Sequence, residues 1–284
     1  MRRFLIQVLV AGFLIISALG GYLFYKVQNA KQQIQDFLNT SLARLQDANT
    51  HLDYDLFQCS GIVKLECKSS RLDILKKDML ILSFSNITLS LKDFDSKSLS
   101  LDLSSSIRNI YGHKEEFSDI LPRTLKTTTK FEFLKDQELW AKSVIKLDSK
   151  DLSYQFEMIS TMDIDPKKRG LLKFIQEANF KQEKIYLSAI DFLLKRKQGE
   201  FYSQKEQYTK LAGLLFVLSV LYQKQYGFSL GINDVFNGII ELFLGKKESL
   251  YVALKNQEKF CLNCGEFDLE RLHQFLRQQK IEVK

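Results

Sequence analysis

The chain has 284 residues, a net charge of +7 and 45% hydrophobic residues. Apolar content of this size is ordinary for a globular protein and excludes a largely disordered chain. The basic residues are dispersed among acidic ones, which argues against nucleic-acid binding and favours a solvated surface, with attraction to anionic lipid headgroups as the next interpretation.

The chain starts with two arginines, followed by an apolar run from Phe4 to Tyr25 that only Gln7 and Ser17 interrupt. A run of this length, at about 1.5 Å per residue, matches the roughly 30 Å hydrocarbon core of a bilayer. We therefore expect residues 1–25 to form a transmembrane anchor.

The alternative for this segment is a cleaved signal peptide, because Ala18-Leu19-Gly20 resembles a signal-peptidase site. Aromatic residues continue the apolar run beyond that site and suit a membrane interface, which favours an uncleaved anchor. Basic residues on the two sides are nearly balanced, but a short charged tail before one long span usually stays inside. This predicts that the large C-terminal domain lies outside the cytoplasm, and the bias toward lysine over arginine fits an AT-rich bacterial genome.

Residues 26–48 carry apolar side chains mostly three to four residues apart in a polar background, at Val27, Ile34, Phe37, Leu38, Leu42 and Leu45. This spacing predicts an amphipathic stalk helix that continues out of the membrane. The apolar stripe would either pack on the following domain or bind a partner helix.

Residues 49–284 form the predicted extracytoplasmic domain, which is rich in strand patterns up to about residue 165. Apolar and polar residues alternate most clearly in the runs Val63–Cys67, Ile87–Leu91, Leu99–Leu103 and Leu152–Met158. Alternation with one polar face predicts antiparallel strands that are covered on one side only. Closely spaced turn signals, such as Asp148–Lys150, favour a meandering sheet.

After about residue 203 the domain is expected to be mainly helical. The predicted helices are Ser203–Gln223, Ile232–Leu244 and a last one from Asp268 to Gln278, with a strand at Ser249–Asn256 and shorter helices at Glu115–Leu125 and Gly170–Ala178. The first of these contains an almost continuous apolar stretch from Leu211 to Tyr222. Because about twelve residues are too few to span a bilayer, we expect a buried helix.

The predicted fold class is therefore α+β: an anchor, a stalk, and a largely antiparallel sheet packed with C-terminal helices. A curved sheet closed by very apolar helices can enclose a groove for lipid chains, although an ordinary packed core explains the same pattern. The residues expected to line such a groove are Leu211, Leu214, Leu215, Leu218, Leu221, Phe236 and Ile240.

Four cysteines, Cys59, Cys67, Cys261 and Cys264, are disulfide candidates in an oxidising compartment. An unbroken strand would hold the first two about 26 Å apart, so a bond between them needs a chain reversal at Ser60-Gly61. Otherwise the early pair crosslinks to the late pair. The spacing of Cys261 and Cys264 also fits a redox motif or half of a zinc site.

No motif in the sequence nominates an active site. The histidines His51, His113 and His273 are scattered, the acidic pairs look solvated, and no serine has a nucleophile-elbow context. We expect neither a cofactor nor a metal.

The layout resembles the AsmA-like and related bacterial proteins, which have one N-terminal span and a β-rich periplasmic region. The resemblance lies in the basic start and anchor, the helix through Gln32-Gln33-Ile34-Gln35, the segment Tyr54-Asp55-Leu56-Phe57 before Gly61 and the strand Ile62–Glu66, and a helix ending Leu242-Phe243-Leu244-Gly245 before the strand Leu250–Leu254. It implies envelope maintenance and, as in several members, lipid handling. The small size and the cysteines depart from the long members and from a bridge-like conduit.

Two functions are thus expected: a non-enzymatic envelope protein that binds lipid or another apolar ligand, or an interaction module of an envelope assembly that recruits its partner through the stalk helix. A redox protein that uses Cys261 and Cys264 is a third class.

Overall fold

The structure is a computed structural model, and it confirms an α+β fold with a mostly antiparallel sheet. It describes residues 31–36, 38–40, 42–43, 50–61, 65–92, 98–110, 119–133, 138–163, 184–197, 205–227, 230–261, 275 and 279–284.

Eleven strands form one sheet. They are β1 (Thr50–Tyr54), β2 (Gln58–Ser60), β3 (Glu66–Lys76), β4 (Met79–Lys92), β5 (Ser98–Ile110), β6 (Thr124–Phe133), β7 (Glu138–Asp148), β8 (Leu152–Asp163), β9 (Ile185–Arg196), β10 (Ser249–Cys261) and β11 (Gln279–Val283). The long helices are α3 (Lys205–Tyr226) and α4 (Leu230–Phe243), and residues 31–36, 38–40 and 42–43 are also helical.

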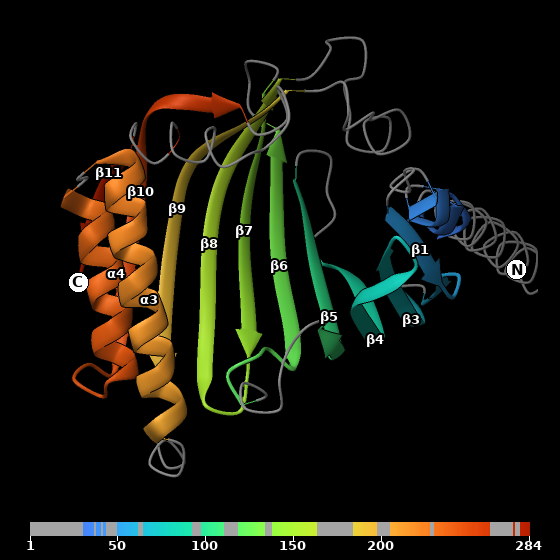
Figure 1. Cartoon of the computed structure of the whole chain (residues 1–284). Coiled ribbons are helices and arrows are strands. Elements are labelled where there is room, and N and C mark those ends of the chain that lie inside the picture. The colour runs from blue at the N-terminus through green and yellow to red at the C-terminus, as the bar shows by residue number, and fades with distance from the viewer. Residues whose placement is uncertain are drawn as a thin grey trace, which may run out of the picture.

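The sheet is a meander, as the closely spaced turn signals predict. From β3 to β11 each strand pairs with the next one in the chain, and every pairing is antiparallel. Figure 1 shows the sheet curving from β1 at one end to β11 at the other, with α3 and α4 on the face turned toward the viewer.

The helical hairpin of α3 and α4 interrupts the chain between β9 and β10 without interrupting the sheet, because these two strands pair directly. The sequence predicts a mainly helical segment with one strand after residue 203. The two helices and the strand at Ser249–Asn256 are confirmed, but β10 continues to Cys261 and β11 follows near the end of the chain.

The short helix expected at Glu115–Leu125 is wrong for its described part. Residues 119–121 form a turn and a bend, and β6 starts at Thr124. The helix expected at Gly170–Ala178 lies outside the described residues, and so does most of the one from Asp268 to Gln278.

In the part of the chain that the structure describes, no helix is long and apolar enough to cross a membrane. The predicted anchor, residues 1–25, lies outside these ranges.

The main core lies between the helical hairpin and the strands β8 to β11. Leu152, Leu242 and Leu250 have no exposed surface there, and Leu194 is nearly as buried. Gly238 lets α4 approach the sheet closely, since a Cβ at this position would lie 2.4 Å from the Leu250 Cδ1 atom. The helices therefore pack firmly on one end of the sheet.

Only one side of α3 belongs to this core. Tyr208 and Ala212 are buried and Leu215 packs against them, whereas Leu214 and Val217 on the other side are more than half exposed. The expectation of a buried helix is wrong for the outward side of α3, because α3 and α4 form a single layer and the sheet and α4 cover only one side of α3.

A buried polar contact fixes the start of α3. The Tyr208 hydroxyl donates a hydrogen bond of 2.5 Å to Asp151 Oδ2 at the turn before β8. Burial first, and then the bond to Asp151, raise the pKa of Tyr208 well above its ordinary value. The hydroxyl therefore remains protonated and can donate throughout the physiological pH range.

We expect Tyr208→Phe to destabilise the protein by roughly 1.5–3 kcal/mol, because a buried carboxylate loses its donor. The Asp151 Oδ1 atom already has no hydrogen-bond partner in the described structure, so nothing there compensates. Tyr154→Phe is the control: it removes a neutral bond of 2.8 Å to the Ile120 carbonyl and should cost about 1 kcal/mol. Denaturant unfolding measures both values, and equal losses would contradict a special role for the Tyr208–Asp151 contact.

Candidate functional site

The register of the central strands brings uncharged side chains together on one face. Directly opposed residues of antiparallel strands point to the same side of a sheet. Three rows cross β5 to β8 in this way: Leu103–Thr127–Ile145–Phe156, Leu101–Thr129–Ser143–Met158 and Leu99–Phe131–Ala141–Ser160. We call these twelve residues the central face.

The central face lies on the same side of the sheet as the helical hairpin. Phe156 is paired with Phe192 of β9, and their ring centroids are 4.8 Å apart. Phe192 in turn packs against the core beneath the helices, and that core draws its described strand residues from β8 to β11. The helices thus cover one end of this side and leave the face of β5 to β7 open.

None of the twelve residues is charged, and all except the buried Leu99 are partly exposed. The Thr129 and Ser143 hydroxyls lie 3.0 Å apart and hydrogen-bond to each other, so two of the polar groups on this face are mutually satisfied. Four strands and three rows cover roughly 14 Å by 14 Å at the usual strand and residue spacings. The area is therefore roughly 200 Å², and it is its uncharged, hollowed shape rather than its size that makes it a candidate binding site.

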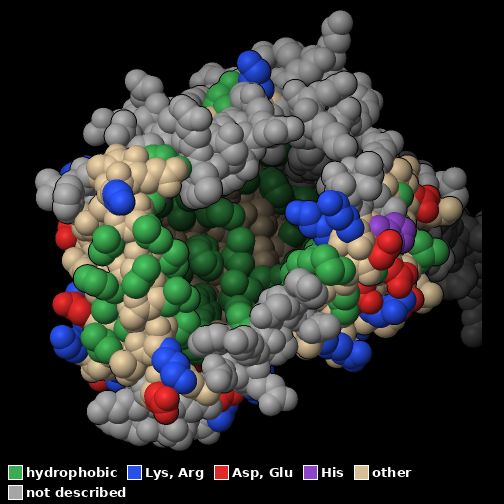
Figure 2. Space-filling view, in the orientation of Figure 1, with side chains coloured by type: hydrophobic (Ala, Val, Ile, Leu, Met, Phe, Trp, Pro, Cys, Tyr) green, Lys and Arg blue, Asp and Glu red, His purple; other side chains and the backbone are tan. Residues whose placement is uncertain are grey.

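Figure 2 shows that this side of the molecule is hollowed. Hydrophobic side chains line the hollow between the helical hairpin on the left and the β3–β5 end of the sheet on the right. The shape is that of a ligand site, which is usually concave, mostly apolar and formed before the ligand arrives.

The opposite side of the same strands is charged. Lys126, Thr128 and Lys130 of β6 are exposed there, and Lys142 of β7 forms an ion pair of 2.5 Å with Glu157 of β8. The two sides of these strands therefore differ: the charged side is solvated, whereas the central face is uncharged and only partly covered by protein.

The residues predicted to line a groove do not come together. Leu211, Leu215 and Ile240 pack into the core beneath the helices, and Phe236 lies beside Tyr222. Leu214, Leu218 and Leu221 point outward from α3, where each is about half exposed. A groove is present, but the strands line its floor, and the predicted leucines of α3 are divided between the core and the outer surface.

The first two cysteines form the local disulfide that a chain reversal allows. Cys59 of β2 and Cys67 of β3 are directly opposed, with their Cα atoms 3.9 Å apart. The early pair is therefore not crosslinked to the late pair. Cys261 is also disulfide-bonded, and Cys264 lies outside the described residues.

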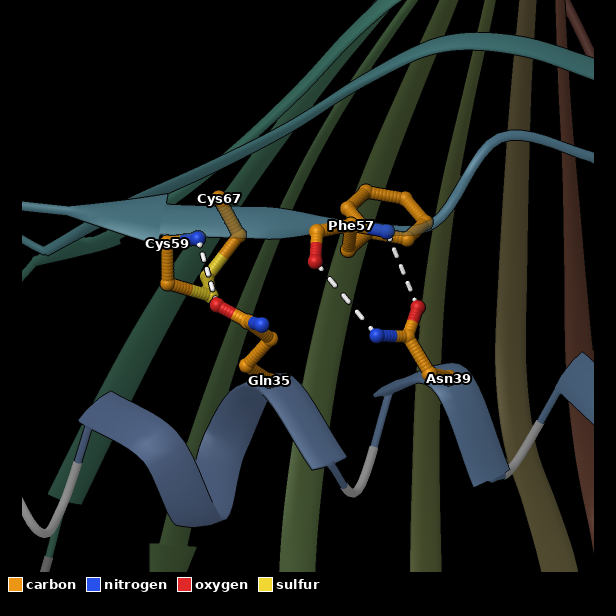
Figure 3. The surroundings of a disulfide bond; sticks show 5 residues. All are labelled: Gln35, Asn39, Phe57, Cys59 and Cys67. Atoms are coloured by element: carbon orange, nitrogen blue, oxygen red, sulfur yellow. Dashed lines mark hydrogen bonds between the residues drawn. A yellow bond between two sulfur atoms is a disulfide. The ribbon is translucent and has the colours of Figure 1, made fainter.

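The helical segment at residues 31–43 docks beside this disulfide (Figure 3). The Cys59 backbone N–H donates a hydrogen bond of 3.0 Å to Gln35 Oε1, and the Phe57 N–H donates one of 2.9 Å to Asn39 Oδ1. The Asn39 Nδ2 group also donates to the Phe57 carbonyl at 3.4 Å. The two amide side chains thus supply hydrogen bonds to the outer edge of β2 that another strand would otherwise make.

Apolar contacts accompany these hydrogen bonds. Ile34, Leu38 and Leu42, which belong to the predicted amphipathic stripe, pack against the cluster that contains Phe57 and the disulfide. Of the two expectations for this stripe, the structure shows packing on the domain.

We expect replacement of Cys59 and Cys67 by serine to lower the free energy of unfolding by about 2.5 kcal/mol, the chain-entropy value for a loop of this length. Because Gln35 binds the Cys59 backbone, the loss should also loosen the helical segment. Hydrogen exchange of residues 31–43 measures this effect. If the variant is less stable but hydrogen exchange of residues 31–43 is unchanged, the disulfide does not support the docking of the helical segment.

Within the described ranges no three side chains of His, Cys, Asp or Glu come together to hold a metal ion. Comparison with protein-family models, with curated proteins and with solved structures finds no match for this chain. The candidate function therefore depends on the geometry of the central face.

Proposed function

We propose that this chain is a non-enzymatic envelope protein, anchored in the bacterial inner membrane by residues 1–25, whose periplasmic domain binds a lipid or another apolar ligand on the central face. The observation that carries the proposal is a hollowed, uncharged face that the protein's own helices leave open.

The contrast with the helix-covered end of the sheet supports this assignment. Leu194 and Leu250 continue the same side of the sheet and are almost completely buried by the helical hairpin, whereas Leu101, Leu103 and Phe156 remain partly exposed. Burial of apolar surface stabilises by about 25 cal/mol per Å². An apolar ligand on the central face would gain this free energy with little rearrangement of the protein.

The chemistry of the face favours a ligand with a long apolar part. The face offers no charged group to an ionic ligand, and its hydroxyls at Thr129 and Ser143 are already hydrogen-bonded to each other. A phospholipid or fatty acid would place its acyl chains on these strands and keep its headgroup at the solvent-exposed rim. The proposed anchor would hold the site close to a source of such molecules.

The alternative, an interaction module that recruits a partner through the stalk helix, is less well supported. Ile34, Leu38 and Leu42 of the apolar stripe already pack on the domain, so a partner helix would have to displace them. A redox role for Cys261 and Cys264 has no support from the geometry of the described residues.

Photocrosslinking tests the proposal. A photoreactive phenylalanine replaces Phe131, which belongs to the central face, in the full chain in its native membrane. The control replaces Trp140, which is opposed to Glu132 and therefore lies on the charged side. We expect a lipid adduct, identified by mass spectrometry, at Phe131 and none at Trp140. Equal labelling at both positions, or none at either, would overturn the assignment of the site.

A further inference from the structure

A second apolar surface lies on α3, and it is separate from the central face. Six large side chains on the outward side of this helix are between 46% and 60% exposed: Leu214, Phe216, Val217, Leu218, Val220 and Leu221. We call them the α3 outer face. Gly213 lies on the same side, where an added Cβ would meet no other atom within 4 Å.

The width of the α3 outer face is unusual for a contact between two proteins. At 3.6 residues per turn, the six side chains cover an arc of about 200° from Phe216 to Leu218. A helix that packs on one protein surface needs an apolar stripe of about 100°, and α3 already uses its inner side, with Tyr208 and Ala212, for the core. Apolar side chains over the rest of the circumference suit contact with lipid hydrocarbon, which can cover the whole outward side of the helix.

Charge marks the two ends of this surface. No charged residue lies between Lys210 and Lys224, and both lysines are exposed and belong to the outward arc. Glu206 is also exposed and forms an ion pair of 3.2 Å with Lys210, so Lys224 carries most of the unpaired positive charge. Lysines at the ends of an apolar helix face can extend to lipid headgroups while their stems remain in the apolar layer.

We infer that the α3 outer face docks in the interfacial layer of a bilayer that contains anionic lipid, with α3 lying along the membrane rather than crossing it. The uncharged stretch of α3 is too short to span the hydrocarbon core. The inference rests on the proposed anchoring of the chain beside a membrane, but it does not require that the central face binds a ligand.

Tryptophan fluorescence tests the docking in the full chain. Trp140, the one tryptophan of the sequence, is replaced by phenylalanine, and Leu221→Trp then provides a reporter on the α3 outer face. Thr128→Trp, at an exposed position on the charged side of the sheet, is the matched control. Both chains are reconstituted in vesicles of phosphatidylethanolamine and phosphatidylglycerol with brominated acyl chains, and flotation first reports whether the chain is attached.

We expect the Leu221→Trp emission to shift to the blue and to be quenched by the brominated chains, whereas the Thr128→Trp emission should stay unquenched. Adding Lys210→Gln and Lys224→Gln should reduce the quenching of the Leu221→Trp chain. If the chain floats but both reporters are quenched equally, or neither is, docking is overturned while anchoring stands. A blue shift without quenching would place protein, such as a second copy, on α3 and overturn the inference. A chain that does not float would overturn the anchoring and the docking together.

Discussion

Thr127→Glu is expected to abolish retention of the ligand by the full chain. Thr127 belongs to the central face, where it lies directly between Leu103 and Ile145. A carboxylate at this position would be desolvated by any acyl chain that covers it, and a penalty of several kcal/mol corresponds to a loss of affinity of about a hundredfold or more. Quantification of the lipid extracted with the purified protein measures this effect.

The neighbouring residue provides a matched control. Thr128→Glu introduces the same change one position along β6, but this side chain is exposed on the charged side, with Lys126 and Lys130 two residues away on either side. We expect wild-type lipid content and wild-type stability. If both variants lose lipid equally, the ligand does not lie on the central face, or the effect is a general one on β6.

Leu242→Ala is expected to cause the largest loss of stability. The Leu242 side chain has no exposed surface and belongs to the core between α4 and the sheet. Truncation of a buried leucine typically costs 2–5 kcal/mol, or roughly 5 to 15 °C in melting temperature for a domain of this size. Thermal unfolding followed by circular dichroism measures the change.

Leu244→Ala is the corresponding control, because Leu244 lies two residues further on and is 42% exposed. The expected loss is below about 1 kcal/mol, since little apolar surface changes its surroundings. A similar loss in both variants would mean that the helical hairpin is not firmly packed on the sheet. That result would also argue against the helical hairpin as a rigid boundary of the hollow over the central face.

The sequence predicts several strands of the sheet correctly, because these strands have one solvent-exposed side and one apolar side. Alternation at Leu99–Leu103 and Leu152–Met158 identifies β5 and β8, and the short turn at Asp148–Lys150 correctly indicates an antiparallel neighbour. The pattern is weaker in β6 and β9. In β6 a run of three threonines conceals the alternation, and in β9 both sides carry apolar residues, so neither strand was predicted.

The site was harder to predict than the fold, because a groove depends on which apolar surfaces remain uncovered. The apolar composition of α3 suggests that its leucines line a groove, but the sequence does not show that α3 and α4 form one layer over one end of the sheet. The central face becomes visible only when the register aligns residues from four strands, several of which, such as Thr127 and Ser143, are not conspicuously apolar. The pairing of Cys59 with Cys67 likewise required the chain reversal after β2 to be known.

The most direct test of the central claim is native mass spectrometry of the full wild-type chain, taken from its own membrane into mild detergent, with the bound material extracted and identified. We expect a chain that carries a stoichiometric lipid or other molecule with a long apolar part. We also expect the additional mass to disappear in Thr127→Glu and to persist in Thr128→Glu. A wild-type chain at the mass of the bare polypeptide, with nothing in the extract, would contradict the central claim.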